Sequence, residues 1–204
     1  MIISISGPSG SGKTTLANYL VKKIGFPDVT LIDLDSYYID QSHISYSNRI
    51  KLNFDDPKLI DIDLFLNHLE RLRNGYSIEK PVYNYKDHLR STDIEIINSK
   101  KYIIIDGIHC LTFKKLRQSC DIKIYLDIDP DVCFIRRLKR DMEERGRTLE
   151  SVIKQYLETV RPMQKKYIIP AKKYADYVLY ERNFINNGKV NNIYFEIMRY
   201  AENK

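Results

Sequence analysis

Residues 7–14 read GPSGSGKT, and this stretch decides the fold expected for the chain around it. The pattern G-x-x-x-x-G-K-[ST] is a P-loop, whose glycines let successive backbone N–H groups converge on phosphate oxygens. The apolar run at residues 1–6 predicts a buried strand, and residues 14–24 place Leu16, Leu20 and Ile24 at helical spacing. Strand, glycine loop and helix in this order point the helix N-terminus at the phosphates. The sequence therefore predicts a site for a nucleotide polyphosphate.

The residues of this loop have separate expected roles. Lys13 can reach the β- and γ-phosphates, and the hydroxyl of Thr14 can bind Mg²⁺. The residues that we expect to hold ATP in this loop are Gly7, Ser9, Gly10, Ser11, Gly12, Lys13, Thr14 and Thr15.

Composition limits the class of protein. The chain of 204 residues is 43% hydrophobic, enough for a single domain over residues 1–204 with a small excursion. The absence of a long apolar run and of a signal pattern predicts no membrane partner and a cytoplasmic location. Cys110, Cys120 and Cys133 lack metal-ligand spacing and are typical of reduced thiols. The net charge of +6 suits nucleic acid or polyphosphate, but much of it lies between residues 136 and 147, which favours polyphosphate.

Strands and helices are expected to alternate after the P-loop. Strands are expected at 29–35, 101–107, 121–129 and 175–181, and helices at 61–73, from Pro130 onward, and at 149–173 with an interruption near Arg161 and Pro162. Residues 192–202 fit either a helix or a strand. The alternation predicts an α/β fold, a P-loop NTPase-type parallel sheet flanked by helices. Residues 78–98 form an extended excursion, expected as a small β-hairpin with its return strand at 93–98.

Acidic residues follow two of these strands, where ligands of parallel sheets bind. Asp106 ends the apolar run YIIID and is expected to be a direct or indirect Mg²⁺ partner. Asp35 lies just past the second strand, and its carboxylate could accept the proton of an acceptor hydroxyl. Asp33 competes for this role, but Asp35 is nearer the strand end. The candidate metal ligands are thus Thr14, Asp35 and Asp106.

The helix after Pro130 is expected to have two faces. At 100° per residue, the apolar face would hold Val132, Ile135, Leu138 and Met142, and the basic face Arg136, Arg137 and Arg140. Arg145 and Arg147 flank Gly146 just beyond. The arginines could form a solvated basic face. The glycine favours instead a mobile lid over residues 141–147 that closes on phosphates, which arginine binds bidentately.

The excursion carries Tyr83, Tyr85 and His88 close together. A lone histidine is more often structural than functional. Aromatic rings with one adaptable donor can nonetheless hold a planar base by stacking and edge hydrogen bonds. The other histidines show no metal spacing, and we assign them no role.

Taken together, these residues make the chain resemble the uridine–cytidine kinase family over about residues 2–181. The motifs that carry the resemblance, in order, are GPSGSGKTT, DSYY, NFDDP, PVYNYKDHLR, IIDGI, RRLKRDMEERGR and QYLETVRPMQKKYIIPAKKYADYV. The resemblance implies transfer of the ATP γ-phosphate to the 5′-hydroxyl of uridine or cytidine with Mg²⁺, giving UMP or CMP in pyrimidine salvage. It further implies a homo-oligomer, commonly a tetramer, and no nucleic-acid partner.

The resemblance also implies roles for single residues. Asp35 matches the base of the family, and Asp55 matches the aspartate that binds the ribose hydroxyls. The residues expected to contact the nucleoside are Tyr38, Tyr83, Tyr85, His88, Arg137 and Gln155. The arginines expected to act on the phosphates are Arg140, in catalysis, and Arg145 and Arg147, in nucleotide binding and lid closure.

The chain departs from the family pattern at three places. Asn84 stands where aspartate is common, which could relax a contact to His88. Asp106 replaces a glutamate, so its reach to Mg²⁺ is one methylene shorter and a bridging water could be needed. Residues 41–51 are polar and unlike the usual pattern.

Two rival functions stay open from the sequence. A related P-loop kinase could act on another small alcohol, such as phosphoribulose, pantothenate or nicotinamide riboside, although the tyrosines and His88 favour a flat pyrimidine. A non-enzymatic P-loop switch or nucleic-acid-binding module is the other rival. A GTPase would carry an N-K-x-D motif for guanine, which this sequence lacks.

Overall fold

A five-stranded sheet forms the centre of the computed structural model, which describes residues 1–85, 87–180 and 188–203. Its strand order is β2-β5-β1-β6-β7, and every neighbouring pair is parallel. The strands are β1 (Ile2–Ser6), β2 (Val29–Asp33), β5 (Tyr102–Asp106), β6 (Ile122–Asp127) and β7 (Tyr177–Tyr180). The predicted parallel sheet is confirmed. Glu181, the last residue of the strand expected at 175–181, lies outside the described residues.

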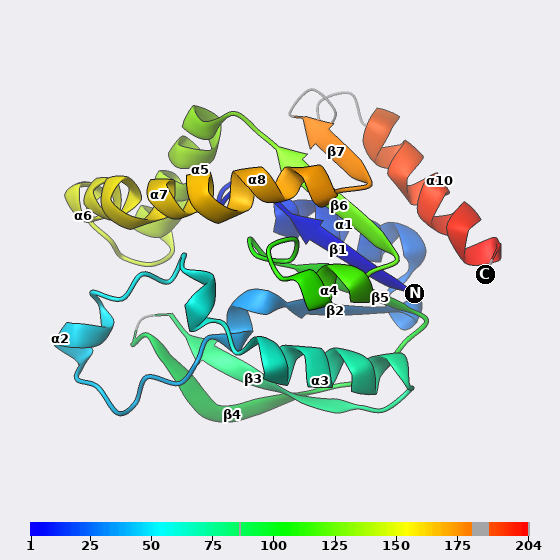
Figure 1. The fold of residues 1–204 in the computed structure, drawn as a ribbon, viewed down its shortest axis with the longest axis horizontal. Helices are drawn as coiled ribbons and strands as arrows, with labels where there is room; N and C mark the ends of the chain where they lie inside the picture. Colours follow the sequence, from blue (N-terminus) through cyan, green and yellow to red (C-terminus); the bar gives the residue numbers. More distant parts are fainter. Residues whose placement is uncertain (86, 181–187, 204) are drawn as a thin grey trace.

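Apolar clusters cover both faces of the sheet, as the unbroken apolar strands require. On one face, Ile3, Ile5 and Leu126 pack with α1 (Lys13–Ile24) and α10 (Gly188–Glu202). On the other face, Ile103 and Ile105 pack with α3 (Ile62–Arg73). The parallel strands point toward the left of Figure 1, where α2 (Tyr46–Arg49) and α6 (Leu149–Gln155) also lie. The hairpin of β3 (Ile78–Asn84) and β4 (Leu89–Ile97) extends toward the same side.

The structure is helical over residues 192–202 and continuously helical from residue 149 to residue 171. Residues 192–202, open between helix and strand, belong to α10, whose Val190, Ile193 and Ile197 are buried at helical spacing. The interruption expected near Pro162 is wrong as a break: π-helical turns at 156–160 and 164–168 join α6, α7 (Arg161–Met163) and α8 (Ile169–Ala171) into one helical run (Figure 1). A wider π turn changes the bonding ahead of proline, which has no N–H to donate and whose ring clashes in a regular α-helix.

The faces expected for α5 (Pro130–Glu143) are wrong at Ile135, Met142 and Arg137, although Val132 packs against the core as expected. Its buried residues are Cys133, Arg137 and Asp141, while Ile135 is 62% exposed and Met142 is 43% exposed. Periodicity alone assigns apolar residues to the interior, but the inward face of α5 meets the P-loop and a polar site. Charged residues therefore take positions that an ordinary core would fill with leucine.

The expected excursion is confirmed as an antiparallel hairpin of β3 (Ile78–Asn84) and β4 (Leu89–Ile97), with a register shift between Pro81 and Tyr83. The return strand begins at Leu89 rather than at 93. Its residues are largely exposed, so they show no burial alternation to mark the start of the strand. Lys86, at the tip, lies outside the described residues.

The short helix α4 (Lys114–Ser119) follows β5 and buries Leu116. Within the part of the chain that the structure describes, none of the helices combines the length and the apolar character needed to span a bilayer.

Candidate active site

The P-loop joins β1 to α1 through three glycines with left-handed backbone, Gly7, Gly10 and Gly12. Gly10 has a second constraint, because a Cβ there would lie 2.2 Å from the carbonyl oxygen of Cys133 in α5. The loop therefore packs directly on the helix that carries the arginines. Lys13 is buried, and its Nζ donates a hydrogen bond of 3.0 Å to the carbonyl of Pro8.

Thr14 and Asp106 meet at the carboxyl end of β5. The hydroxyl of Thr14 donates to Asp106 Oδ2 at 2.5 Å. Asp106 Oδ1 is buried and has no hydrogen-bond partner among the described residues, and burial raises the pKa of this carboxyl. An orphaned carboxylate oxygen beside a hydroxyl is a donor set that fits Mg²⁺, which prefers oxygen ligands.

The two competing aspartates at the end of β2 have different surroundings, because Asp33 is the last residue of the strand and Asp35 lies in the helical turn that follows it. Asp33 accepts hydrogen bonds from the backbone N–H of Ser36 and from Lys80, both at 2.8 Å. Asp35 is half-buried, and none of the described residues donates a hydrogen bond or forms an ion pair with it. Burial raises the pKa of Asp35 to about 6, against the opposing charge of Lys13. Asp33 is thus engaged in holding the hairpin, whereas Asp35 is available to a ligand.

Five rings form one aromatic group next to these acids: Tyr38, Phe54, Tyr83, Tyr85 and His88. Ring centroids lie 5.0 Å apart between Tyr38 and Tyr83, and 5.2 Å apart between Tyr83 and Tyr85. Phe54 stacks on His88 with centroids 4.8 Å apart and an interplanar angle of 17°. The hydroxyl of Tyr83 is buried without a hydrogen-bond partner among the described residues. The expected nucleoside residues of the hairpin and Tyr38 are thus brought together.

His88 lies at the tip of the hairpin in the left-handed region, with φ of 52°. Burial lowers its pKa, and nearby arginines, Arg147 first, add to the effect. The imidazole is therefore neutral at physiological pH. Asn84 bonds to Asp87 in the same turn, with its Nδ2 donating to Asp87 Oδ2 at 2.7 Å. Arg49 of α2 also reaches this tip, through a hydrogen bond of 3.2 Å to the carbonyl of Asp87.

Asp55 is held from two sides. Its Oδ1 lies 3.8 Å from Nη1 of Arg137, and its backbone carbonyl accepts a 2.9 Å hydrogen bond from Nε2 of His109. His109 Nδ1 therefore accepts from the hydroxyl of Thr112, at 3.2 Å. Burial lowers the pKa of His109 to about 4, so this clamp stays neutral. Burial also raises the pKa of Asp55.

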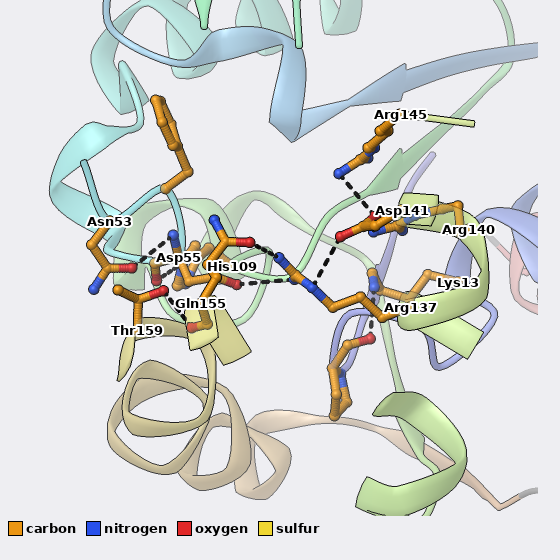
Figure 2. A network of polar contacts seen from close by, with 12 residues as sticks. Lys13, Asn53, Asp55, His109, Arg137, Arg140, Asp141, Arg145, Gln155 and Thr159 are labelled. Carbon is orange, nitrogen blue, oxygen red and sulfur yellow. Dashed lines mark hydrogen bonds and ion pairs between the residues drawn. The ribbon is translucent and has the colours of Figure 1, made fainter. Parts of the chain in front are cut away.

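Three of the predicted arginines, Arg137, Arg140 and Arg145, gather around a residue that the sequence did not single out, Asp141, as Figure 2 shows. Arg137 Nη2 donates to Oε1 of Gln155 at 3.1 Å, and Arg147 Nη1 donates to the same oxygen. The guanidinium of Arg145 lies 5.1 Å from the ring centroid of Tyr85, which joins the expected lid to the hairpin. Arg136, expected on the same basic face, is exposed.

Sequence reasoning missed Phe54, His109 and Asp141. Phe54 lies inside a quoted motif, NFDDP, where an aromatic neighbour of aspartate could have drawn attention. His109 and Asp141 carry no local signal, because their partners are remote in sequence or lie on the same helix at spacings that any surface ion pair shows.

A separate cavity of about 550 Å³ lies at the amino ends of the strands, lined in part by Met1, Arg73, Lys100 and Asp121. Two of its cations are already engaged with backbone carbonyls, Arg73 with Ser119 at 2.6 Å and Lys100 with Phe26 at 2.7 Å. The cavity is remote from the P-loop, which follows the carboxyl end of β1 at the other end of the sheet.

Comparison with known proteins agrees with this geometry. The model of the phosphoribulokinase/uridine kinase family matches residues 2–183. A uridine kinase of Halalkalibacterium halodurans is 46% identical over 89% of this chain and 86% of its own. A uridine kinase of Clostridium novyi is 43% identical over 97% of this chain and 92% of its own. In fold, the phosphoribulokinase from Rhodobacter spheroides superposes with a TM-score of 0.63 at 13% identity, covering 88% of this chain and 69% of the other.

Proposed function

Since the chain belongs to the phosphoribulokinase/uridine kinase family, we propose that it transfers the γ-phosphate of ATP to the 5′-hydroxyl of uridine or cytidine. The observation that carries the proposal is the unpaired carboxylate of Asp35, which lies among the charges of the P-loop and next to an aromatic group. Relatives named uridine kinases, 43% and 46% identical over most of their length, support a nucleoside acceptor.

The aromatic group supplies the nucleoside side of the site. Tyr83 and Tyr85 offer ring faces and edges for a pyrimidine, and the unpartnered hydroxyl of Tyr83 can bond a polar edge. His88 is neutral and so offers one donor and one acceptor nitrogen. Asp55, clamped by His109, can accept hydrogen bonds from the ribose hydroxyls. A flat, uncharged substrate suits these groups better than an anionic sugar phosphate.

Asp35 carries the proton chemistry. As the 5′-oxygen forms its bond to the γ-phosphorus, the bond from phosphorus to the β–γ bridging oxygen breaks and ADP leaves. The hydroxyl proton passes to Asp35, which must be ionised to accept it. With a pKa of about 6, the carboxylate is ionised at neutral pH yet more basic than an ordinary aspartate.

Positive charge on the transferring phosphate is the other requirement. Lys13 and the arginines Arg140, Arg145 and Arg147 supply it from the chain. Thr14 and Asp106 would hold Mg²⁺, with Asp35 as the further candidate, and the ion when bound neutralises charge on the β- and γ-phosphates.

The proposal extends to the substrate partner, the cellular location and the assembly of the protein. The substrate partner is a nucleoside, with no role for nucleic acid. The setting is the cytoplasm, in line with the buried thiols of Cys110, Cys120 and Cys133. A homo-oligomer, commonly a tetramer in the family, is the proposed assembly, and light scattering of the purified protein measures it.

The decisive test is a coupled ADP-release assay at saturating MgATP. The panel holds uridine, cytidine, a purine nucleoside, ribulose 5-phosphate, pantothenate and nicotinamide riboside. Turnover of uridine or cytidine well above the others is expected, and Asp35→Asn serves as the matched inactive control. Turnover confined to another alcohol would overturn the nucleoside assignment, and ATP binding with no turnover of any alcohol would overturn the kinase.

A further inference from the structure

Asp141 is the most enclosed charge of the site, with 0% of its surface exposed. Its Oδ1 accepts hydrogen bonds from Nε and Nη2 of Arg140, at 3.0 and 2.8 Å. Nη1 of Arg145 lies 3.4 Å from the same oxygen. Nε of Arg137 lies 3.4 Å from Oδ2. One buried carboxylate therefore faces three guanidinium groups, as Figure 2 shows.

The backbone of Asp141 also makes a hydrogen bond within residues 141–147, the expected lid. Its carbonyl accepts a hydrogen bond of 3.1 Å from the backbone N–H of Arg147. The bond closes residues 141–147 into a loop that turns at Gly146, whose φ is 64°. The expected lid is thus tied to Asp141 at its start and at its end.

The charges around Asp141 do not balance. Arg137, Arg140, Arg145 and Arg147 bring four positive charges, while the carboxylates that face them are Asp55 and Asp141. Arg147 instead bonds to the neutral amide of Gln155. Arg137 is buried, whereas Arg140 and Arg147 are partly exposed and Arg145 is exposed. An excess of positive charge gathered at one accessible place favours an anionic ligand.

The contacts with Asp141 leave donors for such a ligand. Arg140 uses Nε and Nη2, and Arg145 uses Nη1. None of the described residues accepts a hydrogen bond from Nη1 of Arg140 or from Nε and Nη2 of Arg145. A guanidinium held along one edge presents its other donors in a fixed direction, which suits bidentate binding of phosphate.

We propose, on the basis of the proposed kinase function, that Asp141 is a positioning residue that orients Arg140 and Arg145 toward the polyphosphate of the nucleotide. It touches no substrate itself. Its carboxylate fixes the arginine edges that face inward, so that the free edges meet the β- and γ-phosphates without a search through rotamers.

The test is equilibrium binding of inorganic tripolyphosphate and of ATP without an acceptor, by calorimetry on the full chain. In Asp141→Asn, whose side chain has the same shape, we expect affinity for both to fall at least about tenfold. With uridine added, kcat and the KM for MgATP should worsen while the KM for uridine changes less than about threefold. The matched control is Asp131→Asn, an exposed aspartate of the same helix, which should match the parent chain.

Double variants separate positioning from support of the fold. In an Arg140→Gln, Arg145→Gln background, Asp141→Asn should cause no further loss of tripolyphosphate affinity, because its effect passes through those two residues. An additional tenfold loss there would overturn the proposal. So would unchanged tripolyphosphate affinity in Asp141→Asn alone.

A variant that keeps the charge provides a second test if Asp141→Asn does not fold. Asp141→Glu retains a carboxylate but displaces it by one methylene, so we expect a folded protein with weakened tripolyphosphate binding. Parent-like binding by a folded Asp141→Glu would overturn the positioning role. If the parent chain binds tripolyphosphate but turns over no nucleoside, the proposed function fails while Asp141 is still tested by binding alone.

Discussion

At the scale of single residues, Asp35 combines a proposed catalytic role with a cost to the stability of the fold. Its pKa of about 6 exceeds the ordinary value of 3.8, so folding favours the neutral form. Above pH 6 the group is ionised in both states, and the folded state carries a penalty of up to about 3 kcal/mol. The penalty fades as the pH falls toward 4.

Asp35→Asn should therefore lower activity and raise stability together. The neutral amide removes the proton acceptor, so kcat should fall about 10²–10⁴-fold while ATP binding changes little. At pH 7 the free energy of unfolding should rise, and the gain should vanish near pH 4. Turnover assays and denaturant unfolding at the two pH values measure both effects, and undiminished turnover would refute the assignment of the base.

The pH dependence of the reaction gives a second prediction for Asp35. Only the ionised carboxylate accepts a proton, so kcat/KM for the nucleoside should fall about tenfold per pH unit below about pH 6. The control Asp131→Asn should keep this limb. A profile that stays flat from pH 7 to pH 5, in a protein that remains folded, would exclude Asp35 as the base.

His88 offers a prediction about the base of the nucleoside. Its left-handed backbone tolerates asparagine well, so His88→Asn removes the ring without straining the turn. The loss of the stack on Phe54 should raise the KM for uridine about tenfold and leave the KM for MgATP within about twofold. Equal effects on both constants would argue against a role in holding the base.

Motif residues were predictable from the sequence because loop, strand end and spacing are local signals. The P-loop, Asp35 and Asp106 depend on such signals, and the structure brings them to one end of the sheet. Phe54 on His88 and His109 on Asp55 were not predictable, since each pair is joined by the tertiary fold across more than 30 residues.

At the scale of elements, helix α5 shows where periodicity fails. Apolar spacing predicted that Ile135 and Met142 face the core, yet Arg137 and Asp141 do. Hydrophobic patterning assumes an apolar partner, whereas the partners of α5 are a phosphate-binding loop and a polar site. The parallel sheet was predictable because its strands do have apolar partners on both faces, as hydrophobic patterning assumes.

The contact between the P-loop and α5 predicts an unusual cost for Gly10→Ala. The added Cβ would lie 2.2 Å from a backbone oxygen of Cys133, so α5 must move, and with it Arg137 and Asp141. We expect a loss of about 3 kcal/mol or more in unfolding free energy together with loss of ATP binding. The matched control is Gly75→Ala, which has the same sign of φ but no atom within 4 Å of the added carbon, and should cost about 1–2 kcal/mol.

Urea unfolding and ATP titration of both alanine variants measure the difference. Similar losses of stability in Gly10→Ala and Gly75→Ala would mean that backbone strain alone accounts for the effect. The contact between the P-loop and α5 would then not contribute to positioning the arginines of that helix.

At the scale of the whole molecule, the hairpin and the lid segment meet although they are separate in sequence. Arg145 lies over the ring of Tyr85, and Tyr85 also belongs to the aromatic group proposed to hold the pyrimidine. A nucleoside that orders Tyr85 should therefore also fix Arg145, the residue of the proposed lid that we propose to bind the nucleotide. The two substrates should assist each other in binding.

This coupling depends on an aromatic ring and not on its hydroxyl. Tyr85→Phe should keep the cation–π contact with Arg145 and show KM values for uridine and MgATP within about threefold of the parent chain. Tyr85→Leu should raise both values, and uridine should no longer tighten the binding of a non-hydrolysable ATP analogue. Calorimetric titration of the analogue with and without uridine measures the coupling directly. Because cation–π attraction is worth about 0.5–2 kcal/mol, the affinity gained from uridine in the parent chain should lie between about twofold and thirtyfold. Retention of that gain in Tyr85→Leu would show that the hairpin and the lid communicate through other contacts.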